Sequence, residues 1–456
     1  DIENLKPVIQ PGASDSAALD NVFELLNISG QSAPLAKLML IPDAWSKKSK
    51  ILPRDHQRLF NFLNSTMDPW DGPAAIAATD NEWAIVANDR NGLRPLRYTI
   101  TTDKLLFAGS ETGMIRLDER KIVSKGRLGP GEIIGIRINK GKVFNNNEIK
   151  NYLAKEFKHF NNQIVDLEKK ITIDKEKFVF TGSELRKRQH AFGISIEDLE
   201  MILHPMVEDA KEAVGSMGDD TPLAVLSDRY RPLYHFFRQN FSQVTNPPID
   251  SLRENKVMSL KTRFRNLGNI LNFDKLTKEN IYVLESPILS NSQFEKFTKF
   301  FGKNSKIIDC TFTHDKSLIK SLHNILKESE IAVRQGATQL ILTDINLSEK
   351  KIAIPMLLCV GAVNKYLIEK KLRGYVSINI QTGEALDTHS FATILGVGAT
   401  TINPYLALDS LYQRYEKKLF GKLNYEECIE RYIKSINFGL LKIMSKMGIS
   451  VLSSYR

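Results

Sequence analysis

The first part of the chain carries short apolar runs separated by turn signals. The three clearest runs span residues 74–78, 83–87 and 105–108. Between them stand dipeptides such as Asp80-Asn81 and Asn91-Gly92, which are typical of turns between β-strands. We therefore expect these runs to form neighbouring strands of an antiparallel sheet.

A last pair of runs closes this β-rich region. Residues 132–138 and 142–144 are joined by Asn139-Lys140-Gly141, a sequence that suits a tight hairpin turn. From about residue 146 to residue 190 the strand pattern gives way to charged, helical or irregular sequence. This stretch is interpreted as a connector.

Beyond the connector, strand-like apolar runs alternate with amphipathic helical stretches. The runs include residues 281–284, 307–308, 340–343 and 376–380. Strands that alternate with helices predict an α/β domain with a mostly parallel sheet. No internal repeat and no low-complexity linker interrupts the alternation.

Composition narrows the class of protein. The net charge of +10 suggests nucleic acid, but the lysines are interleaved with acidic residues, and we expect no nucleic-acid partner. No apolar run reaches the ~18–20 residues of a membrane span, so we expect no membrane partner. Three scattered cysteines, Cys310, Cys359 and Cys428, are too few for a disulfide framework or a four-thiolate zinc site. They are interpreted as small buried core residues in a reducing, cytoplasmic compartment.

The front of the chain, Asp1-Ile2-Glu3-Asn4, has neither an initiator Met nor the basic-then-apolar pattern of a signal peptide. We therefore expect a chain that is truncated at its front, as a piece of a longer gene product.

Two constellations carry candidate chemistry. The first is a turn-rich opening over residues 10–16 that leads into an amphipathic helix over residues 17–26. Ser14 or Asp15 is suited to cap that helix by accepting a backbone N–H. The alternative is that an ionised Asp15 at the helix start recognises the ammonium group of a ligand.

The second constellation spans residues 89–98 and is followed a strand later by Ser110-Glu111. Asn91-Gly92 suits a tight turn, and Arg94 is held extended by the proline that follows it. On these residues alone the segment predicts a hairpin with an ion pair at a buried edge.

The same residues resemble a known family. Arg90-Asn91-Gly92-Leu93-Arg94-Pro95 followed by a Ser-Glu strand is similar to the amidotransferases of the amino-terminal-nucleophile class. Further blocks, in order, resemble the glutamate synthase large-subunit family: residues 10–16, 19–21, 67–74, 125–131, 189–193, 215–227, 243–250, 285–289, 354–363, 381–385 and 398–407. The resemblance implies an α+β fold, part of a four-layer αββα amidotransferase, followed by an α/β central domain.

The resemblance also implies domain limits and site residues. Residues 1–157 would be the back part of a class II glutamine amidotransferase domain, 158–180 a connector, and 181–456 the central domain, ending just before an FMN barrel. Asp15 would bind the α-amino group of glutamine, and Ala13 stands where a second Gly is usual.

Four more residues take their expected roles from the family. The resemblance places Ser216, Thr245 and Asn246 along an internal ammonia passage and Met217 beside the flavin. A passage for ammonia must exclude bulk water yet offer a few hydroxyl and amide groups. Without the resemblance, the glycines around Ser216 are ordinary loop glycines and Pro247-Pro248 is a rigid bend.

For the whole enzyme, the resemblance implies that glutamine is hydrolysed, that ammonia passes inward, and that 2-oxoglutarate is aminated and reduced at FMN to give glutamate. It also implies an iron–sulfur cluster, electrons from a small NADPH-dependent subunit or from ferredoxin, and an oligomer. The amino-terminal Cys, the Arg for the substrate carboxylate and the oxyanion-hole Asn-Gly pair of this class cannot be placed in the chain, so we expect no activity of the chain alone.

Two other readings stay open on the sequence. One is a different class II amidotransferase, of the phosphoribosyl-diphosphate or fructose-6-phosphate type, although no Gly-rich phosphate loop follows residue 150. The other is a non-catalytic scaffold derived from the glutamate synthase enzyme.

Overall fold

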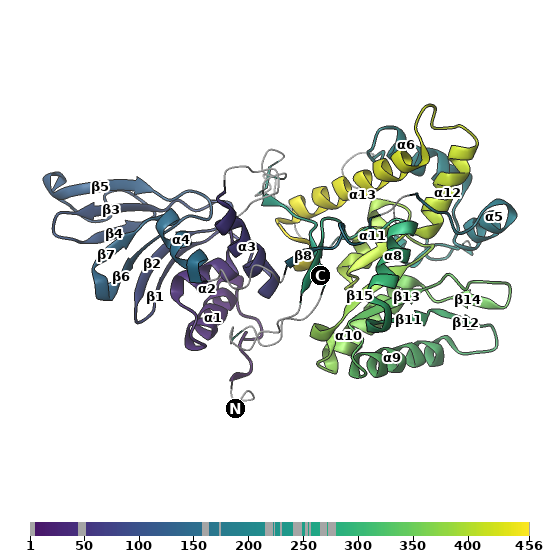
Figure 1. Cartoon of the computed structure of the whole chain (residues 1–456), viewed down its shortest axis with the longest axis horizontal. Coiled ribbons are helices and arrows are strands. Elements are labelled where there is room, and N and C mark those ends of the chain that lie inside the picture. Colours follow the sequence, from purple (N-terminus) through teal and green to yellow (C-terminus); the bar gives the residue numbers. More distant parts are fainter. Residues whose placement is uncertain are drawn as a thin grey trace.

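The structure is a computed structural model, in which two units lie side by side (Figure 1). It describes residues 5–43, 52–156, 164–172, 175–214, 222, 224–228, 230–239, 249–250, 254, 257–264, 271 and 280–455. The first unit holds the β-rich region and four helices, and the second holds a parallel sheet with its helices. No helix among the described residues is long and apolar enough to cross a membrane.

The first unit packs helices against an antiparallel sheet. The sheet has the order β1-β2-β6-β7, formed by Ala75–Thr79, Trp83–Asn88, Ile133–Arg137 and Lys142–Phe144. The helices are α1 (Asp15–Ile28), α2 (Ala33–Leu40), α3 (Arg54–Thr66) and α4 (Asn146–Glu156). Apolar side chains of the helices and of β2 and β6, among them Trp83, form one buried core. The predicted hairpin is confirmed, since β6 pairs antiparallel with β7 and Gly141 has a positive φ.

A second antiparallel sheet corrects two predictions. It has the order β4-β3-β5, formed by Leu106–Gly109, Arg97–Thr101 and Ile122–Arg127. The run 105–108 is therefore not a neighbour of β1 and β2. Residues 89–96 are also not a hairpin turn, because β2 pairs with β1 and β6 whereas β3 pairs with β4 and β5. The segment instead carries the chain from one sheet to the other.

The stretch after α4 contains a strand that the sequence pattern missed. β8 (Ile164–Asp166) pairs parallel with β10 (Ile281–Leu284), and β10 pairs antiparallel with β9 (Thr262–Phe264). A strand this short pairs with partners about a hundred residues away, and no local alternation announces it. Ile281 and Val283 join the core of the first unit, so this small sheet lies where the two units meet.

A parallel sheet in the second unit is confirmed, but the predicted run 281–284 is not part of it, because that run is β10 of the small sheet with β8 and β9. The parallel sheet has the order β11-β13-β15-β16, formed by Ser305–Asp309, Gln339–Thr343, Ser377–Gln381 and Thr401–Asn403. Every residue of β13 is buried, as expected for a parallel strand covered on both faces. β12 (Thr311–Thr313) and β14 (Lys351–Ala353) form a separate antiparallel pair.

Helices surround this sheet and bring distant segments to it. They are α5 (Gly182–Ala191), α6 (His204–Glu208), α8 (Asn291–Phe301), α9 (Leu318–Arg334), α10 (Met356–Glu369), α11 (Thr388–Gly396), α12 (Tyr405–Glu416) and α13 (Tyr425–Met447). A π-helix, Asp198–Leu203, leads into α6. Capping boxes at Ser290, Asp387 and Asn424 fix where α8, α11 and α13 begin.

Candidate functional site

Asp15 begins α1 without serving as its cap. The hydroxyl of Ser14 accepts a hydrogen bond from the Ala17 N–H at 3.2 Å, so Ser14 is the capping residue. Within the described residues, the Asp15 carboxylate accepts a hydrogen bond only from the adjacent Ser16 N–H at 2.8 Å, and the residue is exposed. A carboxylate in the first turn of a helix is favourable for the helix dipole and remains available to a cationic group.

The segment Met67–Pro73 ties Asp15 to the second unit. The Trp70 indole N–H donates to the Asp15 carbonyl at 3.1 Å. The next residue, Asp71, accepts a hydrogen bond from the Ser450 N–H at 2.9 Å and another from the Ser450 hydroxyl. The Ser454 hydroxyl donates to the carbonyl of Pro69 at 3.3 Å. One short segment therefore contacts both the candidate ligand residue and the end of the second unit.

Asp89 organises the loop between the two sheets of the first unit. Its buried carboxylate accepts backbone N–H groups of Asn91 at 2.9 Å, of Leu93 at 3.0 and 3.2 Å and of Arg94 at 3.2 Å. It also accepts the Ala74 N–H at 3.3 Å, which joins the loop to the start of β1. These bonds, rather than a hairpin ladder, satisfy the backbone of the segment that carries the family resemblance.

Gly92 shows why this loop needs a residue without a side chain. Its φ is +65°, a conformation that favours glycine, and a Cβ at this position would lie 2.9 Å from the Pro130 ring. The loop at residues 89–94 and the loop around Pro130 therefore pack directly on each other. This contact places two of the resembling blocks, predicted separately from sequence, side by side.

Buried cations lie beneath these loops. Lys150 pairs with Asp43 at 2.5 Å, and the fully buried Lys37 donates to the Gly131 carbonyl at 2.8 Å. Burial lowers the pKa of Lys37 to about 8, an effect that the neighbouring Asp43 opposes. Arg90 is 5% exposed, and its Nε and Nη1 atoms make no hydrogen bond to the described part of the chain.

Charges also meet across the boundary between the units. Burial lowers the pKa of Arg90, and the negative charges of Asp71 and Asp43 partly offset this lowering. Burial likewise lowers the pKa of Arg263 on β9 to about 10, with Asp68 of the first unit opposing the shift and Arg90 adding to it. The boundary is therefore a charged contact with ion partners from both sides, and not an apolar surface alone.

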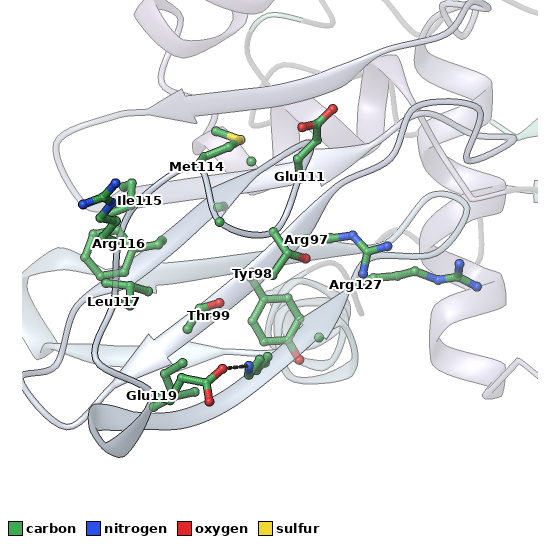
Figure 2. A pocket seen from close by; sticks show the side chains of 18 residues that line it. Arg97, Tyr98, Thr99, Glu111, Met114, Ile115, Arg116, Leu117, Glu119 and Arg127 are labelled. Atoms are coloured by element: carbon green, nitrogen blue, oxygen red, sulfur yellow. Dashed lines mark ion pairs between the residues drawn. The ribbon is translucent and has the colours of Figure 1, made fainter.

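A cavity of about 700 Å³ lies against the β4-β3-β5 sheet (Figure 2). Three resembling segments meet there, contributing Arg97 and Tyr98, Glu111, and Arg127. Glu119 pairs with Lys125 at 3.5 Å on its rim. A Cβ at residue 126 would lie 2.6 Å from the Tyr98 ring, so glycine there allows the ring to lie flat on β5. The described residues place Asp15 outside the lining of this cavity.

Most of the predicted site residues cannot be placed. Ser216, Met217, Thr245 and Asn246 lie outside the described residues. Asp15 is the predicted site residue that the structure describes. The seam formed by Trp70, Asp71 and Ser450 is a feature that sequence reasoning missed, because a contact across 379 residues leaves no local pattern.

The interpretation of the three cysteines as small buried core residues is confirmed. All three thiols are free and buried, Cys310 at the end of β11, Cys359 in α10 and Cys428 in α13. The contact with Cys359 and burial raise the pKa of Cys310 well above its ordinary value. Among the described residues, no group of three or more His, Cys, Asp or Glu side chains is placed to hold a metal ion.

Comparison with known proteins gives first the class and then the family. Residues 1–161 match the family "Glutamine amidotransferases class-II", so the β-rich unit places the chain in that class. Residues 187–456 match the family "Glutamate synthase central domain". The chain belongs to the glutamate synthase family, as the sequence resemblance predicted.

Individual glutamate synthases align with the whole chain or nearly all of it. It is 51% identical to the glutamate synthase [NADPH] large chain of Azospirillum brasilense, with all of this chain and 30% of that protein aligned. The corresponding protein of Bacillus subtilis is 38% identical over all of this chain and 30% of its own length. A ferredoxin-dependent glutamate synthase of Arabidopsis thaliana is 37% identical over 99% of this chain and 29% of its own length. The chain thus spans under a third of the length of these relatives.

Proposed function

We propose that the protein containing this chain makes glutamate from glutamine and 2-oxoglutarate, with this chain supplying part of the glutamine site and the central domain. The observation that carries the proposal is the alignment of the entire chain, through both domains in order, with glutamate synthase large chains. A different class II amidotransferase would match the family model of the first unit, but its second unit would not match the glutamate synthase central domain.

The role proposed for Asp15 is to bind the α-ammonium group of glutamine. Three described features support it: the carboxylate is exposed, the capping function is filled by Ser14, and the backbone is fixed by Trp70. An ionised carboxylate that meets an ammonium group forms a charge-assisted hydrogen bond, which is stronger than a bond between neutral groups. Asp15 would therefore orient glutamine without taking part in bond cleavage.

The finer fold of the first unit also belongs to the proposal. Two antiparallel sheets and four helices are described, with the helices against the β1-β2-β6-β7 sheet. We interpret them as part of a four-layer αββα amidotransferase. The β4-β3-β5 sheet would then be the second of the two inner layers.

The family resemblance implies two cofactors, FMN and an iron–sulfur cluster. The three buried thiols sit on different elements, and no described cluster could hold a metal ion, so an iron–sulfur cluster has no ligand set in the described residues. FMN, which would accept and deliver the reducing electrons, has its one expected contact at Met217, outside the described residues. We propose, from the family resemblance, that both groups belong to the longer protein.

The ammonia passage lined by Ser216, Thr245 and Asn246 remains a proposal. The passage requires that the amidotransferase unit and the central domain keep a fixed orientation to each other. The hydrogen bonds between Asp71 and Ser450 support a fixed orientation. We further propose that the longer protein is a cytoplasmic oligomer, with a small NADPH-dependent subunit or ferredoxin as electron donor.

The test of the proposed function is Asp15→Ala in a chain extended to the length of its relatives. Loss of the charge-assisted bond, ~1.5–3 kcal/mol, should lower kcat/KM for glutamine by about tenfold or more. Glutamate formation from added ammonia should stay unchanged. Asp20→Ala, an exposed acid on the same helix, is the matched control. An unchanged kcat/KM for glutamine would reduce Asp15 to a helix-dipole residue.

The passage has its own test, Thr245→Leu in the same extended chain. If Thr245 lines the passage, the added bulk should leave glutamine hydrolysis measurable but release free ammonia, so that ammonia and glutamate are no longer formed one to one. Tight coupling in this variant and in Asn246→Leu would place the passage elsewhere.

A further inference from the structure

A second cavity lies in the central domain, away from the proposed glutamine site. Its volume is about 230 Å³, and it opens beside the loop that follows β15, at the carboxyl end of the parallel sheet. Ligands of open parallel sheets bind at this end of the strands. The walls come from residues within 192–202, 230–235 and 386–387, together with Ser227. Two sequence blocks to which the proposed function gives no role, 189–193 and 381–385, meet next to it, because a Cβ on Gly383 would lie 2.5 Å from the Phe192 ring.

Two polar groups of the cavity wall lack partners in the described part of the chain. Tyr234 is 8% exposed, and no hydrogen bond of its hydroxyl is found among the described residues. The Nδ1 atom of His235 is buried and accepts or donates no hydrogen bond there. Burial lowers the pKa of His235, which favours the neutral imidazole with one acceptor nitrogen. A buried polar atom without a partner, such as His235 Nδ1, is costly, so a ligand that supplied a partner would stabilise it.

The carboxylates of the wall each keep one oxygen available. Asp198 accepts the Ser195 N–H and hydroxyl through Oδ2 alone, at 2.7 and 2.8 Å. Asp387 caps α11 by accepting the Ser390 N–H through Oδ1 at 2.9 Å. Within the described residues, Asp198 Oδ1 and Asp387 Oδ2 take part in no hydrogen bond. The cavity therefore offers carboxylate acceptors and aromatic faces, with Arg231 as a cationic donor at its wall.

The backbone at Asp198 is itself unusual. Asp198 and Ile202, both in the cavity wall, belong to the π-helix Asp198–Leu203. Such turns are rare and occur often at functional sites, because they shift side chains out of the α-helical register. Here the π-helix carries Asp198 to the same cavity as the loop after β15.

We propose that this cavity binds a small organic molecule through its primary ammonium group. The ammonium N–H groups would be shared among the available oxygens of Asp198 and Asp387 and the hydroxyl of Tyr234. The rings of Phe192, Tyr230 and Tyr234 would cover its carbon atoms and favour the cation. Arg231, exposed at the wall, would bind a carboxylate if the ligand is an α-amino acid.

Calorimetric titration of the purified chain tests the proposal with three small probes. Butylamine carries the ammonium group alone, butyrate the carboxylate alone, and norvaline both. We expect saturable binding of butylamine and none of butyrate. Tighter binding of norvaline than of butylamine, with the difference removed by Arg231→Gln, would identify an α-amino acid. Equal binding of the two would identify a simple amine.

Variants separate the site from nonspecific attraction. Asp198→Asn should weaken butylamine binding by about tenfold or more, and Tyr234→Phe, which keeps the ring, by about threefold or more. Asp209→Asn, an exposed acid outside the wall, should leave binding unchanged, and unaltered melting temperatures would show that all variants fold. Failure of butylamine to saturate, binding of butyrate to the same extent, or equal effects of Asp198→Asn and Asp209→Asn would overturn the proposal. None of these measurements depends on glutamine turnover.

Discussion

Both units bury charged groups, but those whose pKa burial shifts differ in sign: cations in the amidotransferase unit and acids beside the parallel sheet. The amidotransferase unit buries the cations Lys37, Lys150 and Arg90, and burial lowers the pKa of Lys37 to about 8. The central domain buries the acids Asp344 and Asp409 alongside the arginines Arg188 and Arg414. Burial raises the pKa of Asp344 to about 6, and that of Asp409 to about 7.

The difference follows from what each charge holds in place. Lys37 and Lys150 reach from helices to a loop carbonyl and to a carboxylate. The acids of the central domain hold backbone N–H groups, as Asp344 does for Gly383 at 3.1 and 3.2 Å and Asp409 does for Val179 and Phe180 at 2.9 and 2.8 Å. The segments at Val179 and at Gly383 lie outside helices and strands, so their N–H groups lack a backbone ladder and a carboxylate can satisfy them. The comparison teaches that the two units should respond to pH in opposite directions.

The largest expected effect comes from removing Asp89, the buried carboxylate that holds backbone N–H groups in the amidotransferase unit. Asp89→Ala removes the acceptor of N–H groups from Ala74, Asn91, Leu93 and Arg94. Leaving several buried donors unsatisfied should lower the free energy of opening of this unit by about 3–5 kcal/mol. Hydrogen exchange of the β2 and β6 amides measures it. Asp103→Ala, an exposed ion pair, should change the same quantity by less than about 0.5 kcal/mol. Equal effects would mean that Asp89 is dispensable.

The next prediction concerns the buried acids of the central domain. Burial raises the pKa of Glu384 to about 8, with Asp344 adding to the shift, and that of Asp409 to about 7. An acid with a raised native pKa keeps its proton in the folded state after the unfolded chain has lost it, so stability falls as the pH rises from about 4 to about 8. Exchange of the β13 and β15 amides should report a loss on the order of 2–4 kcal/mol. Asp409→Asn should flatten this slope, and a rise in stability would contradict the comparison.

The amidotransferase unit should show the opposite slope at higher pH. The folded unit releases the Lys37 proton above about pH 8, whereas the unfolded chain keeps it until its ordinary value near 10.5. Stability should therefore rise by on the order of 1–2 kcal/mol from about pH 8 to about pH 10. Lys37→Met should abolish the rise in β2 and β6 protection, and Lys140→Met, on the surface, should preserve it. If stability still rises with pH in Lys37→Met, the rise comes from another titrating group.

The smallest effect tests the seam between the units. Asp71→Asn keeps the size of the side chain but exchanges one acceptor oxygen for a donor, weakening the bonds from the Ser450 N–H and hydroxyl. We expect a loss of ~1 kcal/mol, seen as faster exchange of the Ser450 amide, with β2 and β13 protection unaffected. Protection at Ser450 equal to that of the original chain would mean that the two units are held by other contacts.

The local pattern of apolar residues and the short family-like sequence blocks were enough to predict the parallel sheet, one hairpin and the family. The alternation after residue 305 was enough for the parallel sheet, because strands such as β13 are buried throughout with an apolar centre, and helices separate them. The hairpin of β6 and β7 followed from Asn139-Lys140-Gly141. The ordered blocks were enough for the family, which the comparisons bear out. The residues proposed for the ammonia passage and the flavin contact stay predictions.

Only the tertiary structure decided how these parts meet. No local pattern could separate β3 and β4 from the first sheet, because antiparallel runs look alike whichever sheet they join. Likewise, Ser14 and Asp15 were equivalent caps until their geometry assigned the bond to Ser14. The seam at Ser450 and the cavity at Tyr234 join segments far apart in sequence. Their energies depend on groups brought together by folding, whereas a strand or a turn depends mainly on its own few residues.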